Sequence, residues 1–185
     1  MSRKFFLPSA AALFVSLLAT GCGSKAEFYR LSAEAPAAAT GRSEISLGVG
    51  PISLPGYIDR SELVFQSGPN EFQIPPNVSW AGSLQDNIAA VLARDLQTQL
   101  GAREVLSYPW PAGRAPRRRV VLDVRQFHGI SGSDAILEAS WRIEGSSAHG
   151  GGIFREPING DGYAAVVAAE SRLLAQCAAA IAHSL

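Results

Sequence analysis

The sequence predicts a single α/β domain in which two long helices cover a mixed or antiparallel β-sheet. Three observations predict this fold: several segments alternate apolar and polar residues, two segments repeat apolar residues at three- and four-residue spacing, and the order is strands, helix, strands, helix. With 185 residues, 47% of them hydrophobic, the chain is long and apolar enough for one domain with a core.

Residues 1–21 are predicted to be an export signal peptide. Arg3 and Lys4 precede an apolar run from Phe5 to Leu18, which is shorter than the ~20 residues that span a bilayer. Small residues follow, and then Cys22. This arrangement resembles the lipobox of bacterial lipoproteins, which implies that Cys22 carries a diacylglycerol on its sulfur and becomes the mature N-terminus. The alternative is an ordinary secretory signal followed by a chance cysteine.

Residues 22–27 are predicted to be a short lipidated tether to a domain over residues 28–185. Six residues from Cys22 to Phe28 reach at most ~20 Å, which would keep the domain close to the headgroups. Gly23 follows the cysteine. By resemblance to proteobacterial lipoproteins, this residue favours the periplasmic face of the outer membrane over the inner membrane.

The first half of the domain is predicted to hold short strands and one helix. Residues 33–42 are Ala-rich without periodicity and are expected to form a flexible loop, and Pro51 is expected to end the second strand. The helix spans Leu84 to Leu100, with Ser83 as its N-cap and Gly101 as its stop. The expected strands are Phe28–Leu31, Ile45–Val49, Leu63–Phe65 and Phe72–Ile74.

The second half is predicted to hold two long strands and a final helix. The strands lie around Val120–Val124 and Ala135–Ile143 and are joined by a turn over 129–134. The triplet Gly150–Gly152 is expected to break the chain as a flexible loop. The helix starts near Asp161 and runs to the end, and Cys177 lies on its apolar stripe, which predicts a buried, inert thiol.

Composition argues against several classes of function. Sixteen basic residues balance sixteen acidic ones, so no nucleic-acid partner is expected. Two cysteines cannot form a disulfide scaffold or a zinc site, and His128, His149 and His183 lack metal-ligand spacing. No metal site is therefore expected.

The segment starting at His149 is similar to the oxyanion loop of esterases, but the G-x-S-x-G nucleophile motif of that class is missing. No catalytic residue is therefore expected. The rival hypothesis is a lipid esterase in which Ser131 or Ser133 works with His128 or His149.

Two surface features are candidates for binding. The first is a cluster of arginines around a proline: Arg114, Arg117, Arg118 and Arg119. These arginines either form a solvated loop whose charges keep the following apolar strand from aggregating, or they contact anionic headgroups or an acidic partner. Stiff proline-rich segments carry Tyr57 and Trp110, which would either dock on another protein or pack in the core.

Several motifs together form a recognisable pattern. They are the stretch Gly50-Pro51-Ile52-Ser53-Leu54-Pro55-Gly56-Tyr57-Ile58-Asp59-Arg60, the pairs Leu63-Val64 and Trp80-Ala81, the triplet Tyr108-Pro109-Trp110, and the closing helix from Tyr163. In these motifs the sequence resembles the ABC-type transport auxiliary lipoprotein family, which includes the PqiC-like lipoproteins, and the likeness covers essentially the whole mature chain. Ser61 and Gln66 stand where the family more often has proline and a basic residue.

The resemblance implies a non-enzymatic periplasmic subunit of a lipid transport system. It implies two partners: an MCE-domain protein that spans the periplasm, and the inner-membrane transporter of that system. Assembly of the chain with copies of itself, as a homo-oligomer, is a further possibility. No cofactor is expected beyond the covalent diacylglycerol and N-acyl lipid on Cys22. We expect Tyr57, Phe65, Trp110, Arg117 and Arg118 to contact the partner. An envelope lipoprotein of another assembly is a further alternative.

Overall fold

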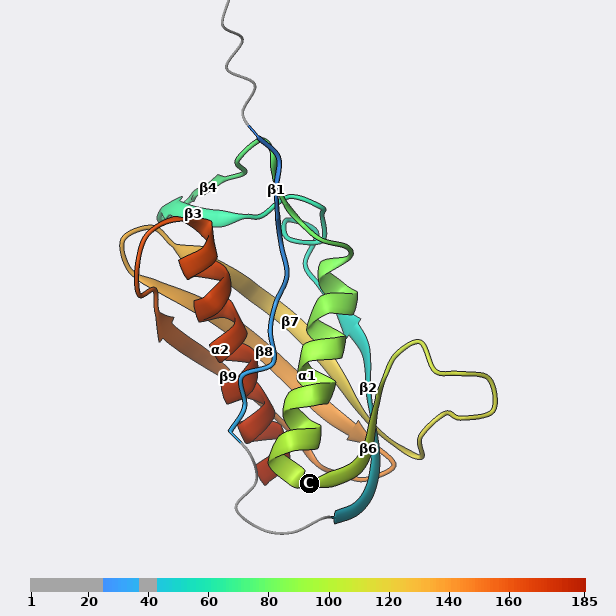
Figure 1. Cartoon of the computed structure of the whole chain (residues 1–185). Helices are drawn as coiled ribbons and strands as arrows, with labels where there is room; N and C mark the ends of the chain where they lie inside the picture. The colour runs from blue at the N-terminus through green and yellow to red at the C-terminus, as the bar shows by residue number, and fades with distance from the viewer. Residues whose placement is uncertain (1–24, 37–42) are drawn as a thin grey trace, which may run out of the picture.

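Two helices lie side by side on one face of a seven-stranded β-sheet in the computed structural model, which describes residues 25–36 and 43–185 (Figure 1). The predicted signal peptide, Cys22 and part of the predicted 33–42 loop lie outside the described residues. Contacts of both helices with strands and with each other enclose the core between the two layers.

The sheet is mixed, as the sequence predicts. Strand β7 lies at its centre, pairing in parallel with β2 and β3 on one side and antiparallel with β8 on the other. Strand β6 extends the sheet beyond β2 in parallel, while β4 and β9 pair antiparallel with β3 and β8. The strands are β2 (Ser43–Ser53), β3 (Phe65–Gly68), β4 (Glu71–Gln73), β6 (Ala102–Ser107), β7 (Arg118–Ile130), β8 (Asp134–Glu144) and β9 (His149–Pro157).

Helix α1 (Leu84–Leu100) has the boundaries that the sequence predicts. The side chain of Ser83 accepts a hydrogen bond from the N–H of Asp86 at 3.3 Å, and Gly101 ends the helix with a φ of 58°, a left-handed conformation that glycine adopts readily. Its apolar stripe is buried against β2 and β6, so the predicted amphipathic helix is confirmed.

Helix α2 (Gly162–His183) follows N-cap Asp161 and packs on β7, β8 and β9. Cys177 is fully buried on its stripe, and burial raises the pKa of the thiol to about 12, as expected for an inert cysteine. The helix is long and apolar enough to cross a membrane by length and composition, but half of it is buried inside the domain. We therefore assign it as a core helix.

Strand β2 passes through Pro51, where the sequence predicts an end. Gly50 has a φ of 116°, and the register with β7 shifts between Val49 and Ile52. This local irregularity in the pairing accommodates the proline within the strand. Sequence analysis did not predict two short strands, β6 and β5 (Val78–Trp80). Strand β5 pairs in parallel with β1 (Glu27–Tyr29). Leu63 and Val64 are buried but precede β3 rather than forming part of it.

The triplet Gly150–Gly152 is not a flexible loop, which corrects the sequence prediction. All three glycines lie inside β9 and pair with Trp141, Ser140 and Ala139 of β8. A Cβ on Gly150 would lie 2.7 Å from Cζ2 of the Trp141 ring. Glycine is therefore required here by a large neighbour on the paired strand, and not by a turn.

Candidate functional site

The residues predicted to bind a partner lie in two places rather than one. Phe65 and Tyr57 lie at the end of the molecule where β3 and β4 of the large sheet lie near the separate β1–β5 pair, which we call the apical end (Figure 1, top). Arg117 and Arg118 lie where β7 begins, at the other end. The 13 residues of β7 run from one place to the other. At a rise of ~3.3 Å per residue, the two places are roughly 40 Å apart.

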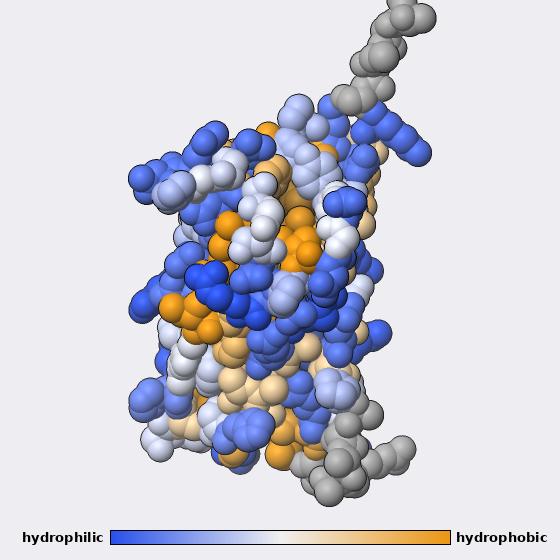
Figure 2. All heavy atoms as spheres, turned by 90° about the vertical axis from the view of Figure 1, so that its left-hand side faces the viewer, coloured by the Kyte–Doolittle hydropathy of each residue, from blue (hydrophilic) through white to orange (hydrophobic). Residues whose placement is uncertain are grey.

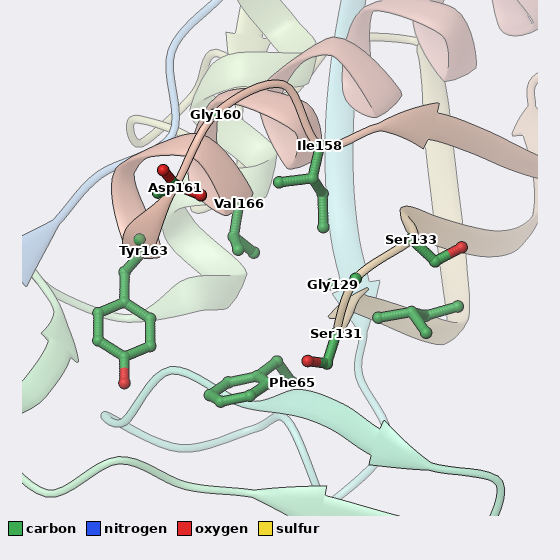
Figure 3. A pocket seen from close by; sticks show the side chains of 12 residues that line it. Phe65, Gly129, Ser131, Ser133, Ile158, Gly160, Asp161, Tyr163 and Val166 are labelled. Carbon is green, nitrogen blue, oxygen red and sulfur yellow. The ribbon is translucent and has the colours of Figure 1, made fainter.

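Phe65 lines an open cavity of about 430 Å³ at the apical end, between β3 and the start of α2 (Figure 3). The turn after β7, which includes Ser131, forms one wall, and the segment from Ile158 to Tyr163 forms another. The ring centroid of Tyr163 lies 5.9 Å from that of Phe65 and 6.4 Å from that of Tyr29. The strand that leads back to Cys22 therefore contacts the rim of this cavity.

The lining of the cavity combines apolar side chains such as Val166 and Ile158 with polar ones such as Ser131 and Asp161. Val166 and Ile158 approach Gly129 of β7 so closely that a Cβ there would lie 2.7 Å from Cγ1 of Val166. Figure 2 views the molecule from the side of α2 and β9, and hydrophobic atoms in its upper half are bordered by hydrophilic ones. Sequence analysis missed this cavity, although the glycines at 129, 132, 160 and 162 mark the segments that form it.

Tyr57 takes part in a network around His128 of β7, which is only 1% exposed. Nε2 of His128 lies 3.3 Å from Oε1 of Gln66, which only accepts hydrogen bonds, so Nε2 carries the proton. The Tyr57 hydroxyl then donates to Nδ1 over 3.1 Å. The amide nitrogen of Gln66 donates to the carbonyl of Gly68 at 2.9 Å, which fixes this orientation of its side chain. Burial lowers the pKa of His128 to about 4, so the ring is neutral.

The same contacts bear on the esterase hypothesis. Both ring nitrogens of His128 are engaged by Tyr57 and Gln66, and Nδ1 of His149 lies 3.1 Å from the backbone oxygen of Ser147. Ser131 and Ser133 instead line the apical cavity. The geometry gives neither serine a histidine base, which a nucleophilic mechanism requires.

Candidate metal ligands do not gather within the part of the chain that the structure describes: it holds no group of three or more histidine, cysteine, aspartate or glutamate residues that could bind an ion.

At the other end, Trp110 packs over β2. A Cβ on Gly48 would lie 2.7 Å from Cη2 of the Trp110 ring, and the ring centroid of Tyr108 is 5.5 Å from that of Trp110. The loop that follows β6 is thus fixed against the sheet on the face opposite the helices. Trp110 is half-buried, which leaves part of its ring accessible.

The four clustered arginines differ in their partners. Arg114 pairs with Glu104 at 2.5 Å and Arg119 with Glu144 at 2.8 Å. Arg117 and Arg118 form no ion pair with any described residue, and Arg117 is exposed. Both residues follow Pro116, whose ring lies against Gly48 as Trp110 does, and they are available to an external anionic group.

Comparisons with known proteins agree with this fold. A solved structure of an uncharacterized protein matches with a TM-score of 0.70 and 22% identity, covering 86% of this chain and 97% of that one. A protein from Xanthomonas campestris of the family DUF330 matches with a TM-score of 0.67 and 19% identity, covering 83% and 91%. These likenesses show the shared fold. No protein of curated function matches the sequence.

The family model described as "ABC-type transport auxiliary lipoprotein component" matches residues 29–182. The match runs from β1 to the last turn of α2 and so includes the whole sheet, both helices and the apical cavity. The resemblance noted in the sequence is confirmed over this length, and the chain belongs to the ABC-type transport auxiliary lipoprotein family.

Proposed function

We propose that this chain is a non-enzymatic lipoprotein subunit of an ABC/MCE-type lipid transport system and docks the transport conduit at the periplasmic face of the outer membrane. Family membership supports an accessory role in transport and a place in the cell envelope. The proposal adds the anchor on Cys22, the outer membrane and an MCE-domain partner.

The observation that carries the proposal is the separation of two ends of the domain. The chain enters at the apical end, where β1 begins only five positions after Cys22. Arg117 and Arg118, which form no ion pair with a described residue, lie with Trp110 at the other end, roughly 40 Å away along β7. A lipid at one end and a cationic, aromatic surface at the other suit a subunit that holds a periplasmic protein partner in front of a membrane.

Anchoring also explains how a small contact surface is sufficient to hold the partner. A lipidated domain is confined to a thin layer beside the membrane, which raises its effective concentration toward other components held there. Trp110 with two arginines is the residue composition typical of binding hot spots. We therefore expect Trp110, Arg117 and Arg118 to carry most of the contact with the partner, and Phe65 and Tyr57 to contribute at the apical end.

The experiment that tests the proposal compares wild type with Cys22→Ala in cells. We expect wild type in the outer-membrane fraction of a density gradient, together with an MCE-domain protein from the same cell. The variant should appear in the soluble periplasm with an unchanged circular-dichroism spectrum. Membrane retention of the variant, or a bare Cys22 sulfur in mass spectra of the wild type, would contradict lipid attachment. Anchored protein without an MCE-domain partner would contradict the docking role.

A further inference from the structure

Exposed hydrophobic side chains gather at the apical end. Among the described residues, five large hydrophobic side chains are strongly exposed, and three of them are at this end: Phe28 (67%), Phe72 (42%) and Ile74 (41%). We call these three the apical rim. Single exposed apolar residues are ordinary, but a group of them at one end of a domain marks an interaction surface.

The apical rim is held rigidly by its surroundings. The N–H of Glu27 in β1 donates to the carbonyl of Asn77 at 2.7 Å, which ties Phe28 to the loop that carries Ile74. Two prolines follow Ile74, and their rings restrict the backbone. Phe72 rests against the Tyr57 ring, with 4.9 Å between ring centroids. Little conformational entropy would therefore be lost when the rim binds.

The position of the rim in the chain indicates what it binds. Lys25, the first described residue of the chain, leads directly into β1 at the apical end (Figure 1). Three peptide units separate Lys25 from Cys22, a reach of at most ~10 Å in extended chain. If Cys22 carries acyl chains, its bilayer therefore faces the end of the domain where Phe28 and the loop of Ile74 are exposed.

We propose that the apical rim inserts into the interface between headgroups and acyl chains of the bilayer that holds the Cys22 lipid. The proposal rests on the lipid attachment in the proposed function and adds a second, protein-mediated contact with the membrane. Aromatic and aliphatic side chains of interfacial segments enter this region to a depth of about 5–10 Å. The anchor has already confined the domain to the surface, so the rim binds as part of the same molecule.

This contact fixes the orientation of the domain. With the apical rim in the interface, β7 points away from the membrane and carries Arg117 and Arg118 roughly 40 Å outward. That distance is several times the Debye length of ~8 Å in physiological salt, so headgroup charges do not reach these arginines. The two arginines then face the periplasm, where a protein partner is the available anionic ligand.

The test uses the full lipidated chain with a single added cysteine at position 28, 74 or 153 (Phe28→Cys, Ile74→Cys, Ile153→Cys), labelled with an environment-sensitive fluorophore. Cys177 is fully buried with a raised pKa and stays unlabelled, and an acylated Cys22 is blocked. Ile153 of β9 is the matched control, since it is 62% exposed but lies away from the apical end. Vesicles contain phosphatidylethanolamine and phosphatidylglycerol, with or without bromine on the acyl carbons nearest the headgroup.

We expect the labels at 28 and 74 to emit at shorter wavelength on vesicles and to lose intensity with brominated lipid, while the label at 153 changes in neither respect. Equal responses at all three positions would show a domain lying flat and would overturn the proposal. A blue shift at 74 without quenching would show a protein contact instead, and would also overturn it. Protein that floats with the vesicles but shows no response at the rim refutes rim insertion alone. Protein that does not float refutes lipid attachment as well.

Discussion

At the scale of single residues, two buried titratable groups give the domain opposite dependences on pH. Glu170 of α2 is 1% exposed and accepts a hydrogen bond from the N–H of Gly129, while its Oε2 finds no partner among the described residues. Burial raises its pKa to about 8, and the hydrogen bond only partly offsets this. The carboxyl group is therefore protonated in the folded protein at neutral pH.

The wild type should lose folding stability as the pH rises, because the buried Glu170 resists ionisation. We expect the variant Glu170→Gln to lack this loss. The unfolded carboxyl group ionises near pH ~4.3, so its contribution to stability is complete below that pH and is lost as the pH rises toward 8. Between about pH 5 and pH 8, the free energy of unfolding of the wild type should fall by roughly 3–4 kcal/mol relative to the variant, at 1.36 kcal/mol per unit of pKa. Urea denaturation at both pH values measures this. Glu71→Gln, at an exposed site, should follow the wild type, and equal slopes for wild type and Glu170→Gln would refute the buried acid.

His128 has the opposite effect, because burial lowers its pKa to about 4. The unfolded imidazole takes up a proton below about pH 6.5, so the contribution of the neutral ring is complete above that pH and is lost as the pH falls toward 4. We expect His128→Gln to reduce this acid-side loss by roughly 2–3 kcal/mol, measured as the slope of unfolding free energy between about pH 6.5 and pH 4. The exposed His149, replaced by Gln, should leave the slope unchanged. A wild-type slope in His128→Gln would contradict the buried, neutral imidazole.

At the scale of elements, the sequence predicts those segments whose apolar residues all face one core. Helices α1 and α2 and strands β7 and β8 were predictable for this reason, because each repeats its pattern over many residues. Strands β5 and β6 were not: β5 has three residues, and β6 follows the stop signal of a helix without a clear alternation of its own. The apical cavity also could not be predicted, since its two glycine-bearing walls meet only after α2 packs on β7.

Strand β9 shows why glycine is ambiguous in a sequence. Its three glycines have the composition of a loop, yet each faces a residue of β8, and Gly150 leaves room for the Trp141 ring. The same ring donates a hydrogen bond from Nε1 to the Ser184 hydroxyl at 3.2 Å, so the end of α2 depends on its position. What decides the conformation is a partner 9 residues earlier in the chain, which local composition does not reveal.

We expect Gly150→Ala to destabilise the domain by about 1–3 kcal/mol, because the new methyl group would overlap Cζ2 of Trp141 at 2.7 Å and force the ring to move. Gly56→Ala is the matched control: no atom lies within 4 Å of the added Cβ, and its backbone φ is not positive. The control should keep wild-type stability to within about 0.5 kcal/mol. The midpoint of urea unfolding and the near-ultraviolet signal of tryptophan report both effects. Equal stability of the two variants would mean that Trp141 does not lie against Gly150.

At the scale of the whole molecule, the separation of the two ends predicts separable functions. In the proposals made above, the lipid on Cys22 and the apical rim act at one end of β7, and Trp110 with Arg117 and Arg118 acts at the other. A change at the arginines should therefore weaken partner binding without releasing the protein from the membrane. A change at the anchor should instead release a folded domain with an intact partner surface.

We expect the double substitution Arg117→Glu and Arg118→Glu to weaken co-purification with the MCE-domain protein by roughly ten-fold or more, since like charges set against an acidic surface cost several kcal/mol. Membrane retention should stay at the wild-type level, because the proposed anchor precedes β1 at the apical end and the arginines lie roughly 40 Å from that end along β7. Arg155→Glu, at an exposed site on β9, is the matched control for charge reversal and should leave both measurements unchanged. Equal loss in the control would indicate a general effect of charge, and release of the double variant from the membrane would show that the arginines contact headgroups instead.

Affinity for the partner, measured in rising salt, is a second test of the contact. A partner contact made by these arginines weakens with ionic strength in the wild type and loses that dependence in the double variant.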